Sequence, residues 1–288
     1  MILITGAAGK TGQALLQALN KRSAAVRALV RTPAQKEAAK ALGASEALVG
    51  DLRNREDLHQ ACRGITAIYH ICPNMQADEF AIATKVMEAA TAAGVPRFVY
   101  HSVLHPQTQA MPHHWHKLQV EEQLFTTRLD FTILQPAAYM QNVLASWSSI
   151  TAAGLYRVPY QTTTQLGMVD LHDVAEAAAQ VLTTAGHSGA IYELASDEWL
   201  TQDTVAAILS EVLARPVRAT MQPRAEWERH ARQSGLTAYA IATLLKMFDY
   251  YERHGFGGNG TILRGLLDRE PTRFADCMAR YASAEALL

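Results

Sequence analysis

The chain opens with Met1-Ile2-Leu3-Ile4-Thr5-Gly6-Ala7-Ala8-Gly9-Lys10-Thr11-Gly12, an apolar run followed by glycines at intervals of three residues. The apolar run suits a buried parallel strand, and Thr11–Leu19 has the apolar spacing of a helix. At such a junction glycines permit a tight turn, a close approach of backbone to a pyrophosphate, and tight helix–strand packing. The helix N-terminus then presents N–H groups and a positive dipole end to phosphates. We therefore expect a dinucleotide to contact Gly6, Ala8, Gly9, Lys10, Thr11 and Gly12.

Other interpretations of the glycine motifs are less well supported than a dinucleotide site. The spacing is G-x-x-G-x-x-G, which differs from the G-x-G-x-x-G of ordinary dehydrogenases. A P-loop NTPase is excluded, because its motif needs glycine where Ile4 stands. A formal G-x-G-x-x-G at Gly255–Gly260 follows a helical stretch, so we expect a helix C-cap and a flexible loop without cofactor. The remaining alternative is that the first glycines merely tighten a turn.

Strand-like and helix-like segments alternate through the first 135 residues. The strand-like runs are Met1–Thr5, Ala25–Arg31, Ala47–Val49, Ala67–Ile71, Phe98–Ser102 and Phe131–Leu134. This alternation predicts an α/β fold with a doubly wound parallel sheet, a Rossmann domain, over residues 1–153. We expect a strand near residues 190–195 to rejoin that domain. Residues 154–288 are expected to form a smaller, mostly helical C-terminal domain that contacts substrate or a partner.

Composition narrows the class of protein. The 288 residues include 26 Lys+Arg and 27 Asp+Glu, and 49% of them are hydrophobic. A net charge of −1 argues against a sequence-independent grip on nucleic acid or an anionic membrane. No run of about 18 apolar residues occurs, and three cysteines are too few for a disulfide framework. We expect a cytoplasmic protein that contacts neither nucleic acid nor membrane directly.

The end of the second strand-like run bears on the choice of nucleotide. In dinucleotide folds a carboxylate about 20 residues past the glycines holds the ribose 2′-OH of NAD. Leu29-Val30-Arg31-Thr32-Pro33 lies at that distance and contains no Asp or Glu. Arg31 suits the 2′-phosphate of NADP(H), which we favour, with NAD(H) possible and a solvated surface arginine as the alternative. Asp51 suits an adenine contact, and Leu52 and Cys72 are further expected cofactor contacts.

Several motifs along the chain, taken together, are typical of one protein family. They are Gly6-x-x-Gly9-x-x-Gly12, Leu29–Pro33, Gly50-Asp51, Phe131–Pro136, Val169–Ala175 and Arg269–Phe274. With these motifs the chain resembles the NmrA-like branch of atypical short-chain dehydrogenases over almost its whole length. The resemblance implies a Rossmann domain carrying NAD(P), a smaller C-terminal domain and a substrate pocket between them. Some members of that family reduce quinones, dyes or other enones with NADPH, and others bind dinucleotide and control a transcription factor.

The same resemblance assigns candidate catalytic residues. Short-chain dehydrogenases typically use Ser and Tyr-x-x-x-Lys, in which tyrosine donates a proton and lysine holds the nicotinamide ribose. Ser102 and Lys117 match that pattern, but His113 stands at the tyrosine position. An imidazolium donates protons near neutral pH, and the i,i+4 spacing places His113 beside Lys117. Ser102 either polarises a carbonyl or binds backbone, and Tyr139 is a second candidate proton donor or a packing residue.

Polar residues surround these candidates. Five of the eleven histidines lie between His101 and His116, with no zinc spacing and no Cys, Asp or Glu among them. We therefore expect no metal site, and a polar pocket wall with His113 or His114 facing substrate. The alternative is that the histidines cap a helix start. Glu121-Glu122 is expected on a solvated helix face.

Two functions follow from these residues. The first is an NADPH-dependent reductase of a small quinone, enone or carbonyl-type substrate, bound in a cleft between the domains. The second, suggested by the missing tyrosine, is a non-catalytic NAD(P) redox sensor that acts through a protein partner. A homodimer is possible under either.

Overall fold

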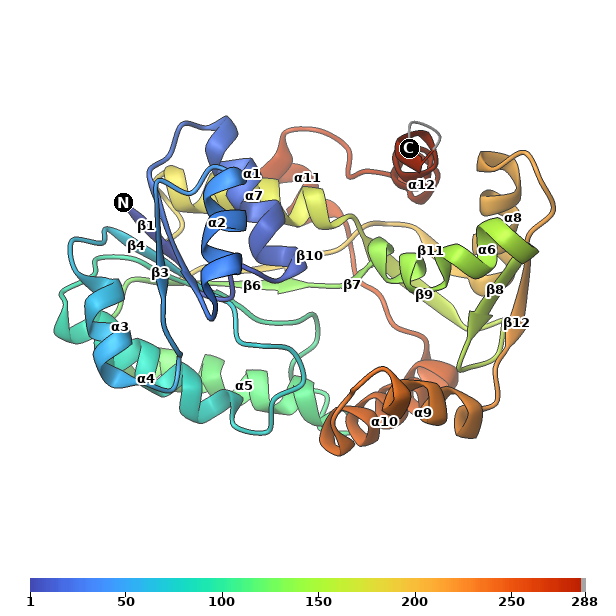
Figure 1. Ribbon diagram of the computed structural model, residues 1–288, viewed down its shortest axis with the longest axis horizontal. Helices are drawn as coiled ribbons and strands as arrows, with labels where there is room; N and C mark the ends of the chain where they lie inside the picture. The colour runs from blue at the N-terminus through green and yellow to red at the C-terminus, as the bar shows by residue number, and fades with distance from the viewer. Residues whose placement is uncertain (286–288) are drawn as a thin grey trace. The chain divides into compact units, whose positions relative to one another are not determined.

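The computed structural model describes residues 1–285, and its first unit is built on a seven-stranded sheet (Figure 1). The strand order is β10-β6-β5-β4-β1-β2-β3. The strands are β1 (Ile2–Ile4), β2 (Val26–Val30), β3 (Glu46–Val49), β4 (Ala67–His70), β5 (Phe98–His101), β6 (Phe131–Pro136) and β10 (Ile191–Leu194). β1 pairs in parallel with both β2 and β4, so Ile4 lies opposite Ala28 and Tyr69. The order therefore reverses at β1, where doubly wound folds bind ligands.

Helices cover both faces of this sheet, with α1, α2 and α7 on one and α3, α4 and α5 on the other (Figure 1). Their bounds are α1 (Lys10–Lys21), α2 (Pro33–Ala41), α3 (Arg55–Cys62), α4 (Glu79–Ala92), α5 (Pro112–Thr126) and α7 (Leu171–Thr183). Apolar residues at helical spacing form the buried face of α1, namely Leu15, Leu16 and Leu19. The predicted α/β fold with a doubly wound parallel sheet is confirmed.

The second unit is mostly helical and contains two small sheets. Its helices are η1 (Met140–Ser146), α6 (Trp147–Ala153), α8 (Gln202–Val212), α9 (Arg224–Gln233), α10 (Ala238–His254), α11 (Thr261–Leu267) and α12 (Phe274–Glu285). Its strands are β7 (Ala138–Tyr139), β8 (Leu155–Val158), β9 (Gln165–Val169), β11 (Trp199–Thr201) and β12 (Arg218–Met221). The sheets have the orders β11-β9-β7 and β12-β8.

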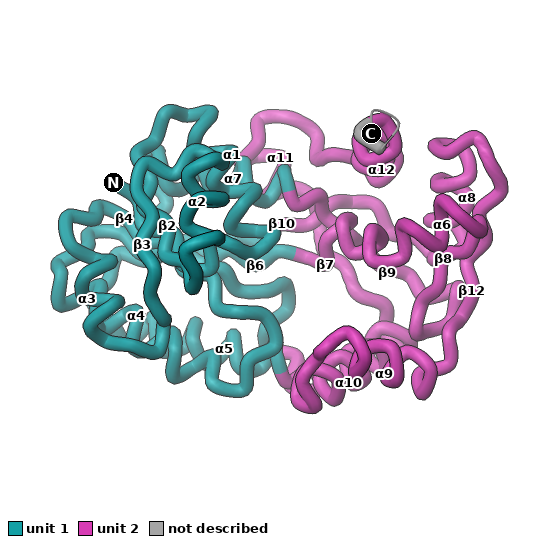
Figure 2. Tube along the Cα trace, in the orientation of Figure 1, with its two compact units in different colours: residues 1–107, 113–136, 172–193 teal, residues 108–112, 137–171, 194–288 magenta. Residues whose placement is uncertain are grey.

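The two compact units are not divided at one point of the chain (Figure 2). The first comprises residues 1–107, 113–136 and 172–193, and the second comprises 108–112, 137–171 and 194–288. This differs from the predicted division at residue 153. The end of α7 belongs with the sheet because the Arg97 guanidinium, just before β5, donates to the carbonyls of Val181 (3.1 Å) and Thr184 (2.8 Å). β10 joins the sheet beside β6, in the place expected for a strand near residues 190–195.

The glycine-rich stretch after α10 is a packed crossing. Gly255 caps α10 with φ +66°, which agrees with the predicted C-cap. Leu166 of β9 forms a bridge with Phe256. A Cβ on Gly257 would stand 2.9 Å from the Cα of Gly167. The expectation of a flexible loop is therefore wrong, because these glycines let the segment cross β9 in close contact.

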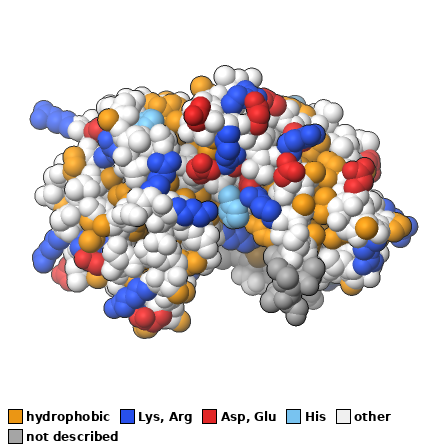
Figure 3. All heavy atoms as spheres, turned by 90° about the horizontal axis from the view of Figure 1, so that it is seen from above, with side chains coloured by type: hydrophobic (Ala, Val, Ile, Leu, Met, Phe, Trp, Pro, Cys, Tyr) orange, Lys and Arg blue, Asp and Glu red, His pale blue; other side chains and the backbone are white. Residues whose placement is uncertain are grey.

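The surface carries charges of both signs. On the face shown in Figure 3, Lys and Arg side chains alternate with Asp and Glu, which accords with the net charge of −1. Within residues 1–285, none of the helices is long and apolar enough to cross a bilayer.

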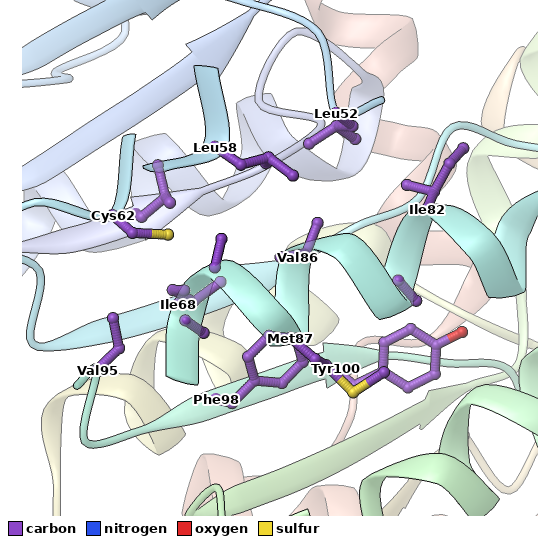
Figure 4. Close-up of a cluster of buried hydrophobic side chains, with 14 of the residues drawn as sticks. Leu52, Leu58, Cys62, Ile68, Ile82, Val86, Met87, Val95, Phe98 and Tyr100 are labelled. Atoms are coloured by element: carbon purple, nitrogen blue, oxygen red, sulfur yellow. The ribbon is translucent and has the colours of Figure 1, made fainter. Parts of the chain in front are cut away.

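One apolar core lies between the sheet and the helices α3 and α4 (Figure 4). Ile68 and Phe98 project from neighbouring strands, and Leu58, Ile82 and Val86 project from the helices. All five side chains are at most 1% exposed. Burial of these side chains stabilises the first unit and holds α3 and α4 against the sheet.

Truncation of this core has a predictable cost. We expect Phe98→Ala to lower the free energy of unfolding by about 3–5 kcal/mol, because a fully buried ring is replaced by a cavity. Phe125 is 55% exposed and contacts Phe131 at its edge, so Phe125→Ala should cost about 1 kcal/mol or less. Urea unfolding of both variants measures the difference. Equal losses in the two variants would contradict this placement of the core.

Candidate functional site

The turn after β1 fits only glycine at two positions. Gly6 has φ +64°, in the left-handed region. A Cβ on Gly6 would lie 2.8 Å from the Ile71 carbonyl oxygen, and one on Gly12 would lie 2.5 Å from the Gly6 carbonyl oxygen. The first and third glycines therefore let the chain turn sharply and let α1 pack against the end of β1. This agrees with the roles expected for them from the sequence.

The middle glycine has another use. Gly9 is exposed and is the N-cap of α1, and it provides no side-chain cap for the helix. The first turn of α1 also lacks acidic residues. An uncapped helix start with its positive dipole end is a site for an anion such as a phosphate. Ala8, Lys10 and Thr11 flank Gly9 along this accessible rim. These features fit the pyrophosphate of a dinucleotide.

Arg31 lies at the carboxyl end of β2, the strand that pairs with β1. Its side chain is exposed. The backbone N–H of Arg31 donates to Gln35 Oε1 (2.9 Å), and Thr32 Oγ1 accepts from the Gln35 N–H (3.2 Å) and caps α2. These bonds fix the backbone while the guanidinium stays accessible. The geometry therefore suits a phosphate beside the end of β2.

The other expected cofactor contacts are of two kinds. Asp51 is exposed, and its carboxylate accepts from the Arg53 backbone N–H (2.8 Å). Leu52 and Cys72 are buried, at 8% and 5% exposure. Burial raises the pKa of the Cys72 thiol far above its usual value, so it remains neutral. These two side chains offer apolar surface after β3 and after β4, and their contact with a cofactor stays a prediction.

Lys117 is held in a half-buried ion pair. Its ammonium donates to Glu79 Oε1 (2.6 Å) and to the carbonyl of His101 (3.1 Å). The side chains of Lys117 and Glu79 are 15% and 3% exposed. The same Glu79 oxygen accepts from the Tyr100 hydroxyl (3.0 Å). The pair joins α5 to the start of α4 and to the end of β5, at the carboxyl edge of the sheet.

The histidine at the tyrosine position is neutral. His113 is 8% exposed, and its Nδ1 is buried without a hydrogen-bond partner. Burial, then the neighbouring His114 and Lys117, lower the pKa of His113 to about 2. Burial thus favours the neutral imidazole in the folded chain, and the role of His113 as a proton donor stays a prediction. The His113 and His114 rings meet edge to face at 4.4 Å.

The other buried histidines are bonded within the protein. His101 Nδ1 shares a hydrogen bond with the Tyr69 hydroxyl (2.7 Å), and His114 Nδ1 lies 3.2 Å from the carbonyl of His105. Burial is the largest cause that lowers the pKa of His101 to about 3 and that of His114 to about 4. Within residues 1–285, His, Cys, Asp and Glu side chains form no group of three or more that suits a metal ion.

Ser102 binds a carboxylate. Its hydroxyl donates to Glu121 Oε1, and Gln135 Nε2 donates to both carboxylate oxygens of Glu121 (3.0 and 2.9 Å). Glu121 is 3% exposed, so the expectation of a solvated face is wrong for it and holds for exposed Glu122. Burial raises the pKa of Glu121, and the bonds from Ser102 and Gln135 oppose this. Because a hydroxyl has one proton to donate, this bond counts against Ser102 as a donor to substrate.

Ser102, His113 and Lys117 are brought together within the first unit. Tyr139 belongs to the second unit, in β7, where it pairs in parallel with Val169 of β9. Its role as a proton donor stays a prediction.

Sequence reasoning did not single out Glu79 or Gln135 as site residues, and it placed Glu121 on a solvated helix face. Gln135 lies within one of the motifs quoted above, but nothing in the spacing marked its side chain as a partner of Glu121. Glu79 stands at the first position of α4, where an acid ordinarily stabilises the helix dipole. Because an acid at this position is so common, the sequence did not indicate that Glu79 pairs with a lysine 38 residues away.

Comparison with known proteins agrees with the resemblance seen in the sequence. A model of the NmrA-like family matches residues 1–276. The chain is similar to NAD(P)H azoreductase of Xenophilus azovorans, with 30% identity over 223 residues, 76% of each chain. It is 31% identical over 294 residues, 99% of each chain, to (4-alkanoyl-5-oxo-2,5-dihydrofuran-3-yl)methyl phosphate reductase of Streptomyces griseus. The Escherichia coli NADPH-dependent quinone oxidoreductase, solved with NADPH, matches with TM-score 0.84 and 26% identity, over 99% of this chain and 100% of that one.

The buried histidines make stability depend on pH. His70, His101, His113 and His114 have folded pKa values of about 3, 3, 2 and 4, below the ordinary 6.5. Below pH 6.5 the unfolded chain binds protons that the folded chain excludes, so this stability is present above pH 6.5 and is lost as the pH falls. We expect a slope of about 1.4 kcal/mol per pH unit for each histidine.

Urea unfolding between pH 7.5 and 5 measures this slope. His113→Phe should lower the slope by about 1.4 kcal/mol per pH unit, the contribution of one histidine. The matched control is His59→Gln, because His59 is exposed, and it should leave the slope unchanged. A slope in His113→Phe equal to that of the unsubstituted protein would mean that His113 is not a buried neutral imidazole.

Proposed function

This chain belongs to the NmrA-like family, and on that basis we propose that it is an NADPH-dependent reductase of a small quinone, enone or carbonyl-type substrate. The observation that carries the proposal is the glycine turn at the end of β1, with Arg31 and no acid at the end of β2. An uncapped helix start and an exposed guanidinium on neighbouring strands suit a pyrophosphate and a 2′-phosphate. The relatives reported above are named as reductases that use NADPH or NAD(P)H.

Different residues of this chain bind different parts of the cofactor. The start of α1 holds the pyrophosphate, Arg31 the 2′-phosphate and Lys117 the nicotinamide ribose. When bound, NADPH supplies hydride for reduction of the substrate. His113, neutral and in edge-to-face contact with His114, contributes a polar wall that does not add positive charge. The proton that completes reduction therefore comes from water. A quinone suits this arrangement, because its reduced form is stabilised without a strong acid beside it.

The substrate is a small molecule, and the chain acts without direct contact to nucleic acid or membrane. The near-neutral charge supports this part of the proposal, since no excess of basic residues is present to hold polyanions. Cys62, Cys72 and Cys277 are all buried, which suits the predicted cytoplasmic location.

One observation favours a second function. The residue at the tyrosine position is an imidazole whose pKa of about 2 removes it as an acid at neutral pH. A protein that binds NADP(H) and never turns over would then act as a redox sensor through a protein partner. Its mark is dinucleotide binding without substrate reduction, with a partner whose retention differs between NADP+ and NADPH.

Turnover separates the two functions. Purified protein is mixed with NADPH and a panel of quinones, azo dyes, enones and aldehydes, and consumption of NADPH is followed at 340 nm. We expect consumption above background with at least one quinone, and little change in the rate on His113→Phe, because the neutral imidazole is not the acid. NADPH binding without consumption across the panel would reject the reductase and favour the sensor.

The choice between NADPH and NADH depends on Arg31. We expect Arg31→Asp to weaken NADPH binding by about tenfold or more, because a charged hydrogen bond to the 2′-phosphate is replaced by repulsion. NADH binding should change little. Arg128→Asp is the matched control. Arg128 is also exposed, but it precedes β6 and so lies at the amino end of its strand, whereas Arg31 lies at the carboxyl end of β2. Titration of each variant with both nucleotides measures the effect, and equal losses for NADPH and NADH would remove this assignment.

A further inference from the structure

We propose that Glu79 is the positioning residue of the nicotinamide-ribose site, and that it acts by fixing the ammonium of Lys117. This inference rests on the proposed function and deepens it. Glu79 lies outside the Ser, Tyr and Lys positions that define short-chain dehydrogenases, so the family pattern does not assign it a role.

The first step is the geometry around the ammonium. Lys117 Nζ has three N–H groups. One points to Glu79 Oε1 at 2.6 Å and a second to the His101 carbonyl at 3.1 Å. Both acceptors belong to the first unit, one at the start of α4 and one at the end of β5. Because the three N–H groups are tetrahedral, two fixed acceptors determine where the third one points. The third N–H is the one that serves a ligand hydroxyl.

The second step is the support of Glu79 itself. The carboxylate is 3% exposed, and its Oε1 also accepts from the Tyr100 hydroxyl at 3.0 Å. Tyr100 is fully buried, and its ring centroid lies 5.4 Å from Lys117 Nζ. A carboxylate held by a rigid phenol and by a helix start has little freedom to move. It therefore limits the flexible four-carbon stem of Lys117 to one geometry.

The third step is the balance of charge. The ammonium of Lys117 contributes to the lowered pKa values of His70, His101 and His113, which are all neutral. None of these imidazoles offers a negative partner. Glu79 is the carboxylate in contact with the ammonium, and a half-buried ammonium without it would be poorly compensated. Loss of the Glu79 charge should thus release Lys117 from its place.

The fourth step is location. Glu79 follows β4 and His101 ends β5, and in the order β5-β4-β1 the first of these strands pairs with β1 and the second pairs with β4. The pair therefore stands at the carboxyl edge that carries the glycine turn. The charges of both Glu79 and Lys117 also act on the thiol of Cys72, the expected cofactor contact after β4. This is the edge at which doubly wound folds bind the nicotinamide half of a dinucleotide.

The test compares two ligands. NADPH occupies the whole site, whereas adenosine 2′,5′-bisphosphate has the adenosine half and its 2′-phosphate but no nicotinamide ribose. Glu79→Gln keeps the size of the side chain and removes its charge. We expect it to raise the Kd of NADPH about tenfold and to leave the Kd of adenosine 2′,5′-bisphosphate unchanged. Isothermal titration measures both without reference to turnover.

Three further variants test whether Glu79 acts through Lys117. Lys117→Met should give the same ligand pattern, and Glu79→Gln combined with Lys117→Met should be no worse than Lys117→Met alone. Glu79→Asp keeps the charge and should restore part of the NADPH affinity. Glu88→Gln, which removes an exposed carboxylate of α4 paired with Arg55, is the matched control and should bind both ligands normally.

The outcomes are distinct. Unchanged NADPH affinity in Glu79→Gln overturns the inference. Equal losses for both ligands also overturn it, because they indicate a structural defect, and additive losses in the double variant show that Glu79 does not act through Lys117. An unsubstituted protein that binds neither ligand overturns the proposed function itself.

Discussion

The ion pair between Lys117 and Glu79 is the constraint around which the carboxyl edge of the sheet is organised. It joins α5, α4 and the end of β5 through bonds of 2.6 and 3.1 Å. It also places one positive charge among several imidazoles. Those imidazoles are buried, and a second cation beside the ammonium is unfavourable, so they remain neutral. The histidine cluster is thus polar without being charged.

The fold was largely predictable, because buried parallel strands appear in sequence as short, continuous apolar runs. Each run from Met1–Thr5 to Phe131–Leu134 overlaps an observed strand. The glycine turn was predictable for a related reason, since left-handed backbone and close helix packing restrict Gly6 and Gly12 to one residue type. Such local constraints restrict the residue type at fixed positions, so they can be predicted from the sequence without knowledge of distant partners.

Much of the polar site was not predictable, because its partners are distant in sequence. Glu121 and Glu122 are adjacent and chemically identical, yet one is buried against Ser102 and Gln135 and the other is exposed. Helical periodicity does not separate them, since α5 carries polar residues on both of its faces. The discontinuous division of the chain into units also depends on contacts between distant residues. Arg97 ties α7 to the sheet through carbonyls more than 80 residues away.

The histidine at the tyrosine position affects which substrates the proposed site could reduce, because it changes the acid available beside them. Burial lowers the pKa of the His113 imidazole, which makes it a weaker candidate for an acid than the phenol of the family pattern. The retained lysine is paired with Glu79, and under the proposed function it serves cofactor binding more than proton transfer. An alkoxide product would need a proton at once, whereas a quinone gives a delocalised anion that water protonates. The residues that remain are therefore better matched to acceptors that tolerate negative charge than to simple ketones.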